Sequence, residues 1–376
     1  MSGPKKVGGA GLRGQSAGET SICTVGVSGS GLTYRGYDIT DLAKTAVFEE
    51  VAYLMFYGQL PNKQALEAYK KTLQSLRFLT PEMQQTLENI PASAHPMDVL
   101  RTACSLLGNQ EMETHFDQQT DKANRMLAMF PSVINYWYHF SHKGYRIEVT
   151  SEEDSIGGHF LHLLHGKRPS ALHTQVMNVS LILYAEHEFN ASTFAARVCA
   201  STLSDIHSAV TAAIGTLRGP LHGGANEAAS DMIHQWSTPE EAEAGIMDML
   251  AQKKLIMGFG HAVYTESDPR NVVIKEYAKA LAKENGDTTV YAIAERVDAV
   301  MAREKKLFPN ADFYHAPAYQ FMGIPTKLFT PIFVCSRVTG WCAHIAEQRS
   351  KNRIIRPNAD YVGPAPRKVQ PIEERS

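Results

Sequence analysis

The sequence predicts a mainly α-helical protein with a small β-hairpin near its N-terminus. Apolar residues in the segment 66–76 recur at helical spacing. Thr80-Pro81 and Thr238-Pro239 each place a capping hydroxyl before a proline at the first helical position, with a carboxylate in the turn that follows. No series of alternating apolar strands separated by turns appears in the chain, so helices should form most of the fold.

The predicted elements follow in chain order. The segments 22–27 and 32–37 flank Ser28-Gly29-Ser30-Gly31, which is typical of a hairpin with a flexible turn. Helices dominate afterwards, and Gly58 followed by Pro61 marks the end of one of them.

Composition narrows the class of protein. With 376 residues, 44% hydrophobic and 20% charged, the chain can bury a large core in two or three domain-sized units. The formal net charge of −2 provides no overall basic field, so we expect neither nucleic acid nor a membrane surface as a partner. An anionic ligand must therefore be bound by local groups.

The cysteines and the N-terminus favour a cytoplasmic protein. The five cysteines are odd in number and include no C-x-x-C pair, which argues against a disulfide framework and a thiolate zinc site. The segment 1–20 lacks the apolar run of a secretory signal, and its few basic residues do not form an amphipathic transit peptide. No apolar stretch reaches the ~18 residues that span a bilayer.

Three short segments in the second half each place one ionisable side chain in a glycine-rich or turn-rich setting. They contain His222, His261 and Asp312. Two imidazoles and a carboxylate can remove a proton from carbon and neutralise charge on oxygen, which is the chemistry of enolising a thioester. A helix should begin just after His222, where converging backbone N–H groups favour a neutral imidazole.

Each of these signals is modest when taken alone. A histidine beside Gly223-Gly224 is more often structural, and Gly258-x-Gly260 is a weak phosphate-binding pattern. Asp312 is also explained as the N-cap of the helix after it. The functional interpretation depends on the three segments occurring together.

A metal site is a competing interpretation for the remaining histidines. His159, His162 and His165 lie at three-residue steps, and His187 lies between Glu186 and Glu188. Three-residue steps drift around a helix, no acidic residue interleaves with them, and H-E-x-x-H is absent. We therefore expect packed or partner-bonded histidines and no metal.

Arginines supply complementary charge. Arg270 ends Asp268-Pro269-Arg270, Arg337 opens the helical run 337–341, and Arg356 lies in the segment 353–357. Arg337 and Arg356 have apolar or aromatic neighbours in sequence, where a fixed guanidinium needs a carboxylate partner. Several such groups suit a small dicarboxylate ligand.

A set of ordered motifs resembles the citrate synthase family from Thr24 onward. The motifs are LHGGANE, GFGHAVYTESDPRN, NADFY, MGIPTKLFTPIF, SRVTGWCAHIAEQR and RIIRPNADYVGP. The stretches 155–166, 184–193 and 24–39 resemble the branch of that family that makes 2-methylcitrate from propionyl-CoA and oxaloacetate.

The resemblance implies a helical homodimer of two-domain subunits. A large domain, 1–222 completed by 331–376, would carry a small domain, 223–330, that closes over the substrates. Asp312 would take the α-proton of the acyl-CoA, His222 would stabilise the thioester oxygen, and His261 would polarise the ketone of oxaloacetate. Water would then cleave the thioester of CoA, which is a substrate, and no permanently bound cofactor is implied.

The resemblance also implies the binding residues. His187, Arg270, Arg337 and Arg356 would hold carboxylates, with Arg356 crossing from the other subunit to complete the active site. The loop that presents backbone groups to CoA would comprise Leu255, Ile256, Met257, Gly258, Phe259 and Gly260.

Two departures from the family bear on the acyl group. Many citrate synthases have arginine and valine where this chain has Ala262 and Ala311. The small Ala311 beside Asp312, together with Tyr184, favours a pocket that takes propionyl, although one methylene is worth only ~1–3 kcal/mol of discrimination. Acetyl-CoA is thus expected as a side substrate. The alternatives are a citrate synthase using acetyl-CoA and a non-catalytic acyl-CoA or tricarboxylate-binding protein.

Overall fold

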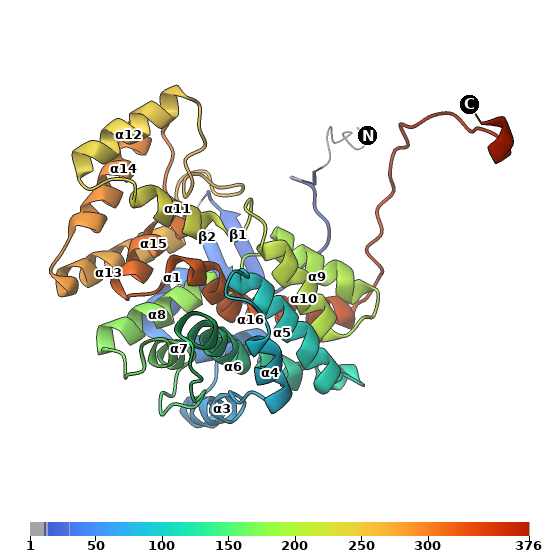
Figure 1. Cartoon of the computed structure of the whole chain (residues 1–376), viewed down its shortest axis with the longest axis horizontal. Helices are drawn as coiled ribbons and strands as arrows, with labels where there is room; N and C mark the ends of the chain where they lie inside the picture. Colours follow the sequence, from blue (N-terminus) through green and yellow to red (C-terminus); the bar gives the residue numbers. More distant parts are fainter. Residues whose placement is uncertain (1–10, 13, 30, 376) are drawn as a thin grey trace.

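The computed structural model describes residues 11–12, 14–29 and 31–375, and it is mainly helical as predicted (Figure 1). Residues 1–10 and 13 of the N-terminal segment 1–20 lie outside the described residues, as does Ser30 of the predicted turn. The strands are β1 (Cys23–Val27), β2 (Gly31–Tyr34) and β3 (Tyr37–Asp38). The helices are α1 (Ile39–Thr45), α2 (Phe48–Tyr57), α3 (Lys63–Ser75), α4 (Pro81–Glu88), α5 (Pro96–Gln110), α6 (Gln119–Tyr138), α7 (Ile156–His165), α8 (Ala171–Tyr184), α9 (Ala191–Ser201), α10 (Ile206–Leu217), α11 (Ala225–Ile233), α12 (Pro239–Ala251), α13 (Pro269–Asn285), α14 (Thr289–Lys305), α15 (Ala311–Phe321) and α16 (Phe329–Ser350).

The predicted hairpin is present, with one difference at its end. β1 and β2 pair antiparallel with Cys23 opposite Tyr34, and β2 pairs antiparallel with β3. The second strand was predicted to continue to Tyr37, but the chain turns at Arg35-Gly36, where both residues have positive φ, and starts a third strand. Gly36 adopts this conformation without a steric penalty, which explains the early turn.

The helix boundaries predicted at Thr80, Thr238 and Gly58 are confirmed. The hydroxyls of Thr80 and Thr238 accept hydrogen bonds from the backbone N–H groups of Met83 and Glu241, so both cap their helices. Gly58 ends α2 in the left-handed conformation.

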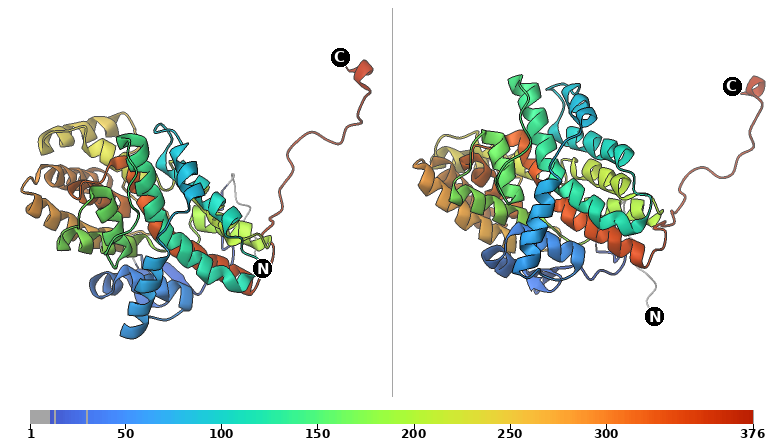
Figure 2. Two further views of the ribbon diagram at one scale, coloured as in Figure 1. Left: turned by 60° about the horizontal axis from the view of Figure 1, so that its bottom comes forward. Right: turned by 90° about the horizontal axis from the view of Figure 1, so that it is seen from below.

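The long helix α16 forms the centre of the core. Nearly its whole length is buried, and it packs against α6, α8, α9 and α10. Figure 2 shows α16, in red, running alongside α6. The helical run was predicted to open at Arg337, but α16 begins at Phe329, so Arg337 lies in the middle of a buried helix. The segment before Arg337 is largely apolar and has no capping side chain, so the sequence did not indicate that the helix starts at Phe329.

Two further parts of the chain matter for the site. The helices α11 to α15 pack on one another, α13 and α11 on α15 and α12 on α14, and lie toward the left of Figure 1. After α16 the chain leaves the body of the molecule as an exposed tail (Figures 1 and 2). None of the helices in the described residues is both long and apolar enough to cross a membrane.

Candidate active site

A cavity of about 370 Å³ collects the predicted site residues from distant parts of the sequence. One side, which we call the helical wall, comprises Tyr184 and His187 at the end of α8 with Phe333 and Arg337 of α16. The opposite side, the loop wall, comprises residues 255–262, 310–312 and Arg270. His222 also lines the cavity. The predicted residues that line the cavity are His187, His222, Leu255, Ile256, Met257, Gly258, Phe259, Gly260, His261, Arg270, Asp312 and Arg337.

Hydrogen bonds fix the proton of His222 on Nδ1. The backbone N–H of Ser192 donates to Nε2 of His222 at 3.3 Å, and the Ser192 hydroxyl lies 2.8 Å from the same nitrogen. The Ser192 hydroxyl accepts from the Trp341 indole N–H at 3.1 Å and donates to Asn190 Oδ1 at 2.8 Å, so the backbone N–H of Ser192 is the group that makes Nε2 of His222 an acceptor. Burial, and next the charge of Arg337, lowers the pKa of His222 to about 4. His222 is therefore a neutral imidazole with Nδ1–H as its donor.

His261 has the opposite tautomer. Its Nδ1 accepts hydrogen bonds from the backbone N–H groups of Val263 and Tyr264, at 3.0 and 3.1 Å, so its proton is on Nε2. The ring of His187 lies 5.0 Å from that of His261, and His187 Nε2 is 3.1 Å from the Tyr264 hydroxyl. Burial, and next the charge of Arg270, holds the pKa of His187 well below its usual value. Two neutral rings thus stand side by side.

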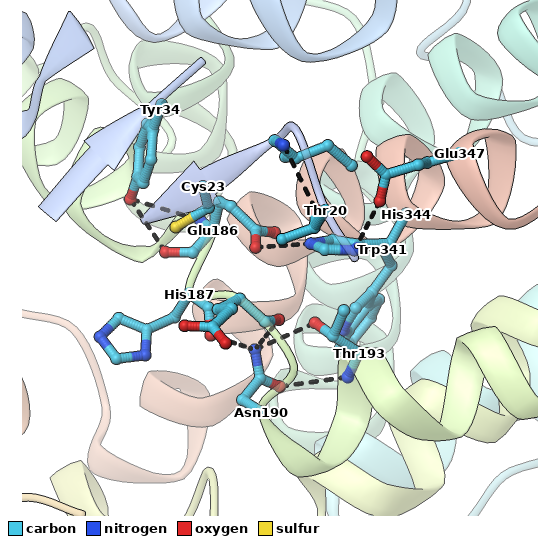
Figure 3. A network of polar contacts seen from close by, with 12 residues as sticks. Thr20, Cys23, Tyr34, Glu186, His187, Asn190, Thr193, Trp341, His344 and Glu347 are labelled. Carbon is cyan, nitrogen blue, oxygen red and sulfur yellow. Dashed lines mark hydrogen bonds and ion pairs between the residues drawn. The ribbon is translucent and has the colours of Figure 1, made fainter. Parts of the chain in front are cut away.

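A buried polar network holds the segment that carries His187 (Figure 3). His344 Nδ1 accepts from Arg197 at 2.9 Å, so His344 Nε2–H donates to Glu186 Oε1 at 2.7 Å. The Tyr34 hydroxyl donates to the backbone oxygen of Glu186 at 3.1 Å. Because Oε1 and the backbone oxygen of Glu186 are both hydrogen-bonded, the adjacent His187 has a fixed position.

Asp312 lies in the first turn of α15. The alternative interpretation of Asp312 as an N-cap is wrong, because Asn310 is the N-cap and its Oδ1 accepts from the Asp312 N–H at 3.1 Å. The Asp312 carboxylate instead lines the cavity, where the Tyr184 hydroxyl donates to its Oδ1 at 2.6 Å. Burial raises the pKa of Asp312, and the Tyr184 hydrogen bond and the Arg270 charge oppose that rise.

Arg270 forms a bidentate ion pair with Asp268. Nε and Nη2 of Arg270 donate to the two carboxylate oxygens at 2.9 and 2.8 Å. Asp268 also caps α13 and accepts from the backbone N–H of Ala311 at 2.9 Å. One buried carboxylate therefore joins Arg270 to the start of the helix that carries Asp312.

Arg337 differs from Arg270 in its partners. Its side chain is only 1% exposed, its Nε donates to the backbone oxygen of Tyr184 at 2.7 Å, and its guanidinium lies 4.7 Å from the Phe333 ring centre. It forms no ion pair with a carboxylate of the described residues. A buried cation in this state requires an anion, and the cavity it lines is where a ligand carboxylate can reach it.

The loop 255–260 is fastened to the segment before α15. Gly258 and Gly260 have positive φ of 86° and 72°, which only glycine adopts readily. The Asn310 N–H donates to Gly258 O at 2.9 Å, and the Asn310 side chain donates to Gly260 O at 3.1 Å. These hydrogen bonds therefore fix the position of the loop relative to Asp312.

Two histidines of the metal hypothesis, His159 and His165, contact other partners. His159 lies 3.2 and 2.9 Å from the hydroxyls of Ser132 and Ser151, and His165 Nε2 lies 2.9 Å from the backbone oxygen of Met322. Among the residues described by the structure, no group of three or more His, Cys, Asp or Glu side chains is arranged to hold a metal.

Comparison with known proteins identifies the family. A family model described as citrate synthase, C-terminal domain, matches residues 11–358. The chain belongs to the citrate synthase family. A 2-methylcitrate synthase from Shewanella oneidensis is 65% identical over 100% of both chains, and citrate synthase 2 from Bacillus subtilis is 45% identical over 92% of this chain and 94% of its own. A citrate synthase from Thermoplasma acidophilum, solved with carboxymethyl coenzyme A and oxaloacetate, superimposes with a TM-score of 0.90 at 34% identity, covering 97% of this chain and 98% of its own.

Membership of the citrate synthase family makes this protein a condensing enzyme of the acyltransferase type. One predicted residue is not in the cavity. Arg356 was expected in apolar surroundings, but it is exposed on the tail and donates to the Asn358 side chain at 2.8 Å. Its apolar sequence neighbours do not cover it within this chain.

Sequence reasoning missed three residues that fix the cavity of this citrate synthase family member. Asp268 could have been predicted, because an Asp before a proline at a helix start is typical of an N-cap. An N-cap at this position lies within reach of Arg270. Ser192 and Trp341 carried none, because they meet His222 only through the packing of α9 and α16.

Proposed function

We propose that the protein condenses propionyl-CoA with oxaloacetate and water, giving 2-methylcitrate and free CoA. The observation that carries this proposal is the buried, carboxylate-free Arg337 in a cavity that also holds Asp312 and neutral His222. A buried cation selects an anionic partner substrate, and the base and imidazole serve enolisation. The 65% identical relative over the full chain supports the choice of propionyl-CoA.

The first step forms the carbon nucleophile. Asp312 takes a proton from the α-carbon of the thioester, and the C–H electron pair becomes the new C=C bond. His222 donates from Nδ1–H to the thioester oxygen as charge develops there, consistent with its neutral tautomer. A donor fixed in advance is effective because it needs no reorganisation during the reaction.

The second step joins the two substrates. The nucleophilic carbon attacks the ketone carbon of oxaloacetate, whose oxygen receives the Nε2 proton of His261. His187, Arg270 and Arg337 bind the carboxylates. Water then adds to the thioester carbonyl and expels the CoA thiolate, which leaves as the thiol.

The remaining family features complete the proposal. The chain forms a large domain, 1–222 with 331–376, and a small domain, 223–330. The two domains close over the substrates around His222, and this closure excludes water from the enolate. The loop 255–260 contacts CoA through its backbone groups. A homodimer places Arg356 of a second copy at the cavity, and the exposed tail that carries Arg356 supports this arrangement (Figure 1). The protein acts in cytoplasmic propionate catabolism, in keeping with its unpaired cysteines.

The acyl preference follows from the small side chain beside the base. Ala311 lines the cavity next to Asp312, which leaves room for the extra methyl group of propionyl. A single methylene provides only about 1–3 kcal/mol of discrimination, so acetyl-CoA is a side substrate. The second candidate is a citrate synthase that prefers acetyl-CoA, and the 45% identical citrate synthase 2 favours keeping it.

The test is thiol release from propionyl-CoA and from acetyl-CoA, with and without oxaloacetate. We expect oxaloacetate-dependent release with higher kcat/KM for propionyl-CoA. Higher kcat/KM for acetyl-CoA would move the assignment to citrate synthase. Absence of oxaloacetate-dependent release from both would favour a non-catalytic binding protein.

A further inference from the structure

Tyr184 makes a contact that the proposed reaction has not used. It is the last residue of α8, its side chain is 1% exposed, and its hydroxyl donates to Oδ1 of Asp312 at 2.6 Å. The ring is stacked against Phe333 at 4.2 Å and lies 4.2 Å from the ring of His315. The hydroxyl is therefore held in place by a ring that has packed partners on α16 and α15.

The two carboxylate oxygens of Asp312 differ in their hydrogen bonding. Oδ1 of Asp312 is occupied by Tyr184, while no described residue donates a hydrogen bond to Oδ2. Resting on the proposed function above, we propose that Tyr184 is a positioning residue for the catalytic base: it holds Oδ1 and leaves Oδ2 to receive the α-proton. The carboxylate then reacts from one fixed rotamer rather than from several.

The same hydrogen bond acts on the ionisation of the base. Burial disfavours the charged carboxylate, whereas a hydrogen bond donated to it favours that form, and the two effects act on Asp312 in opposite directions. The Tyr184 hydroxyl remains protonated because burial, and next the charge of Asp312, raises its pKa well above the usual value. Tyr184 is thus a permanent donor whose hydrogen bond favours the ionised form of Asp312 and opposes the effect of burial.

Tyr184 also connects the two halves of the cavity. Its hydroxyl contacts Asp312 on α15, and its backbone oxygen accepts from Nε of Arg337 on α16 at 2.7 Å. One residue therefore contacts both the group that abstracts the proton and the cation that lies ready for the second substrate. A displacement of Tyr184 changes both contacts together.

The experiment is a Tyr184→Phe variant, which removes the hydroxyl and retains the stacked ring. We measure kcat and KM across pH, and the primary isotope effect on kcat with propionyl-CoA deuterated at the α-carbon. Loss of a hydrogen bond to a charged group lowers kcat by about ten- to a hundredfold. We expect KM for oxaloacetate to stay within about twofold, since the Tyr184 backbone still accepts from Arg337.

The pH profile gives a readout that a merely structural role would not produce. Removing the donor raises the pKa of Asp312, so the ascending limb of kcat/KM moves to higher pH in Tyr184→Phe. The deuterium isotope effect on kcat increases, because proton removal becomes a larger part of the rate limitation. An unmoved ascending limb together with an unchanged isotope effect overturns the inference.

Tyr314→Phe is the matched control. Tyr314 is also on α15 and fully buried, and its hydroxyl donates to the carboxylate of Asp298 at 3.0 Å, outside the cavity. We expect its pH profile and isotope effect to match the parent protein. If Tyr314→Phe shifts the limb as much as Tyr184→Phe does, the effect comes from α15 as a whole and the inference fails.

An Asp312→Asn variant separates this inference from the proposed function. Near-normal turnover in folded Asp312→Asn overturns the assignment of the base and the role of Tyr184 with it. An inactive Asp312→Asn combined with an unaltered Tyr184→Phe overturns only the role of Tyr184.

Discussion

The helical wall and the loop wall of the cavity each hold one buried arginine, and the two are bound differently. Arg270 on the loop wall has a bidentate ion pair with Asp268, whereas Arg337 on the helical wall has, among the described residues, only the backbone oxygen of Tyr184 as a hydrogen-bond acceptor. Asp268 pairs with Arg270, whereas the described residues supply no ion-paired carboxylate to Arg337, on whose pKa burial and next the charge of Glu186 act in opposite directions. Two arginines that are buried alike can therefore differ in whether the fold supplies a carboxylate partner.

The walls also differ in how they hold their functional groups. The helical wall is formed by α8 and α16, whose regular hydrogen bonds and core packing fix its side chains. The loop wall lies on the first turns of α13 and α15 and on the loop 255–262, and individual contacts join these parts, chiefly Asp268 to Ala311 and Asn310 to Gly258. We expect changes in the loop wall to act through local geometry and changes in the helical wall to act through ligand binding.

The largest effect is expected from replacing Asp312, the proposed catalytic base, which lies on the loop wall. Asp312→Asn removes the proton acceptor while keeping the size of the side chain, so we expect kcat to fall about a thousandfold with the fold intact. Stopped assays of thiol release and thermal melting measure the two quantities. Asp298→Asn, a carboxylate outside the cavity, serves as control and should retain activity. Near-normal turnover in Asp312→Asn would falsify the assigned role.

The next prediction tests the ion pair between Asp268 and Arg270, which stabilises the loop wall. Asp268→Asn leaves the buried Arg270 without its counter-charge, and we expect a loss of about 3 kcal/mol in the free energy of unfolding. Chemical denaturation gives the value. Asp298→Asn breaks the more exposed pair with Lys275 and should lose about 1 kcal/mol or less. Equal losses in the two variants would contradict the difference between buried and exposed pairs.

Replacing Arg337 on the helical wall should weaken substrate binding more than it lowers the stability of the fold. Arg337→Gln removes the uncompensated cation, so we expect KM for oxaloacetate to rise about a hundredfold. The increase in melting temperature that oxaloacetate gives to the parent protein should disappear as well. Arg303→Gln, which removes a half-exposed arginine paired with Glu243 and Glu304, is the control. Retention of the oxaloacetate-dependent melting shift in Arg337→Gln would show that Arg337 is not the anion partner.

The smallest expected effect concerns the loop backbone. At Gly258 φ is 86°, and a Cβ there would lie 2.9 Å from Cδ2 of Phe313. Gly258→Ala should therefore destabilise the fold by about 1–3 kcal/mol and raise KM for the acyl-CoA. Gly286→Ala has a similar φ of 83° but open space around it, so it isolates the backbone strain from the clash. If both variants behave alike, contact with Phe313 does not matter.

The sequence predicted the parts of the fold that local chemistry controls. The helix starts at Thr80 and Thr238 and the stop at Gly58 were predicted because capping residues act on neighbouring backbone groups. The end of β2 at Tyr34 and the start of α16 were missed. The first had a local signature in Gly36, which permits the turn after β2. The second lies in a largely apolar segment that packs into the core and has no capping side chain to mark the helix start.

The candidate site shows the same limit at the level of single residues. Glycine-rich and turn-rich settings marked His222, His261 and Asp312, and the structure brings all three to one cavity. The tautomers of the two imidazoles were not predictable, because their partners come from other elements or from turn geometry. The exposure of Arg356 was not predictable either, since apolar neighbours in sequence do not cover a side chain on an extended tail.

The chain of hydrogen bonds from Trp341 through Ser192 to His222 has an optical consequence. An indole whose N–H is coupled to an imidazole changes its emission when the charge or solvation of that ring changes. The chain contains three tryptophans, so replacing Trp137 and Trp236 by phenylalanine leaves Trp341 as the only intrinsic fluorophore of that class. Its emission then reports the state of His222 in real time and without an added label.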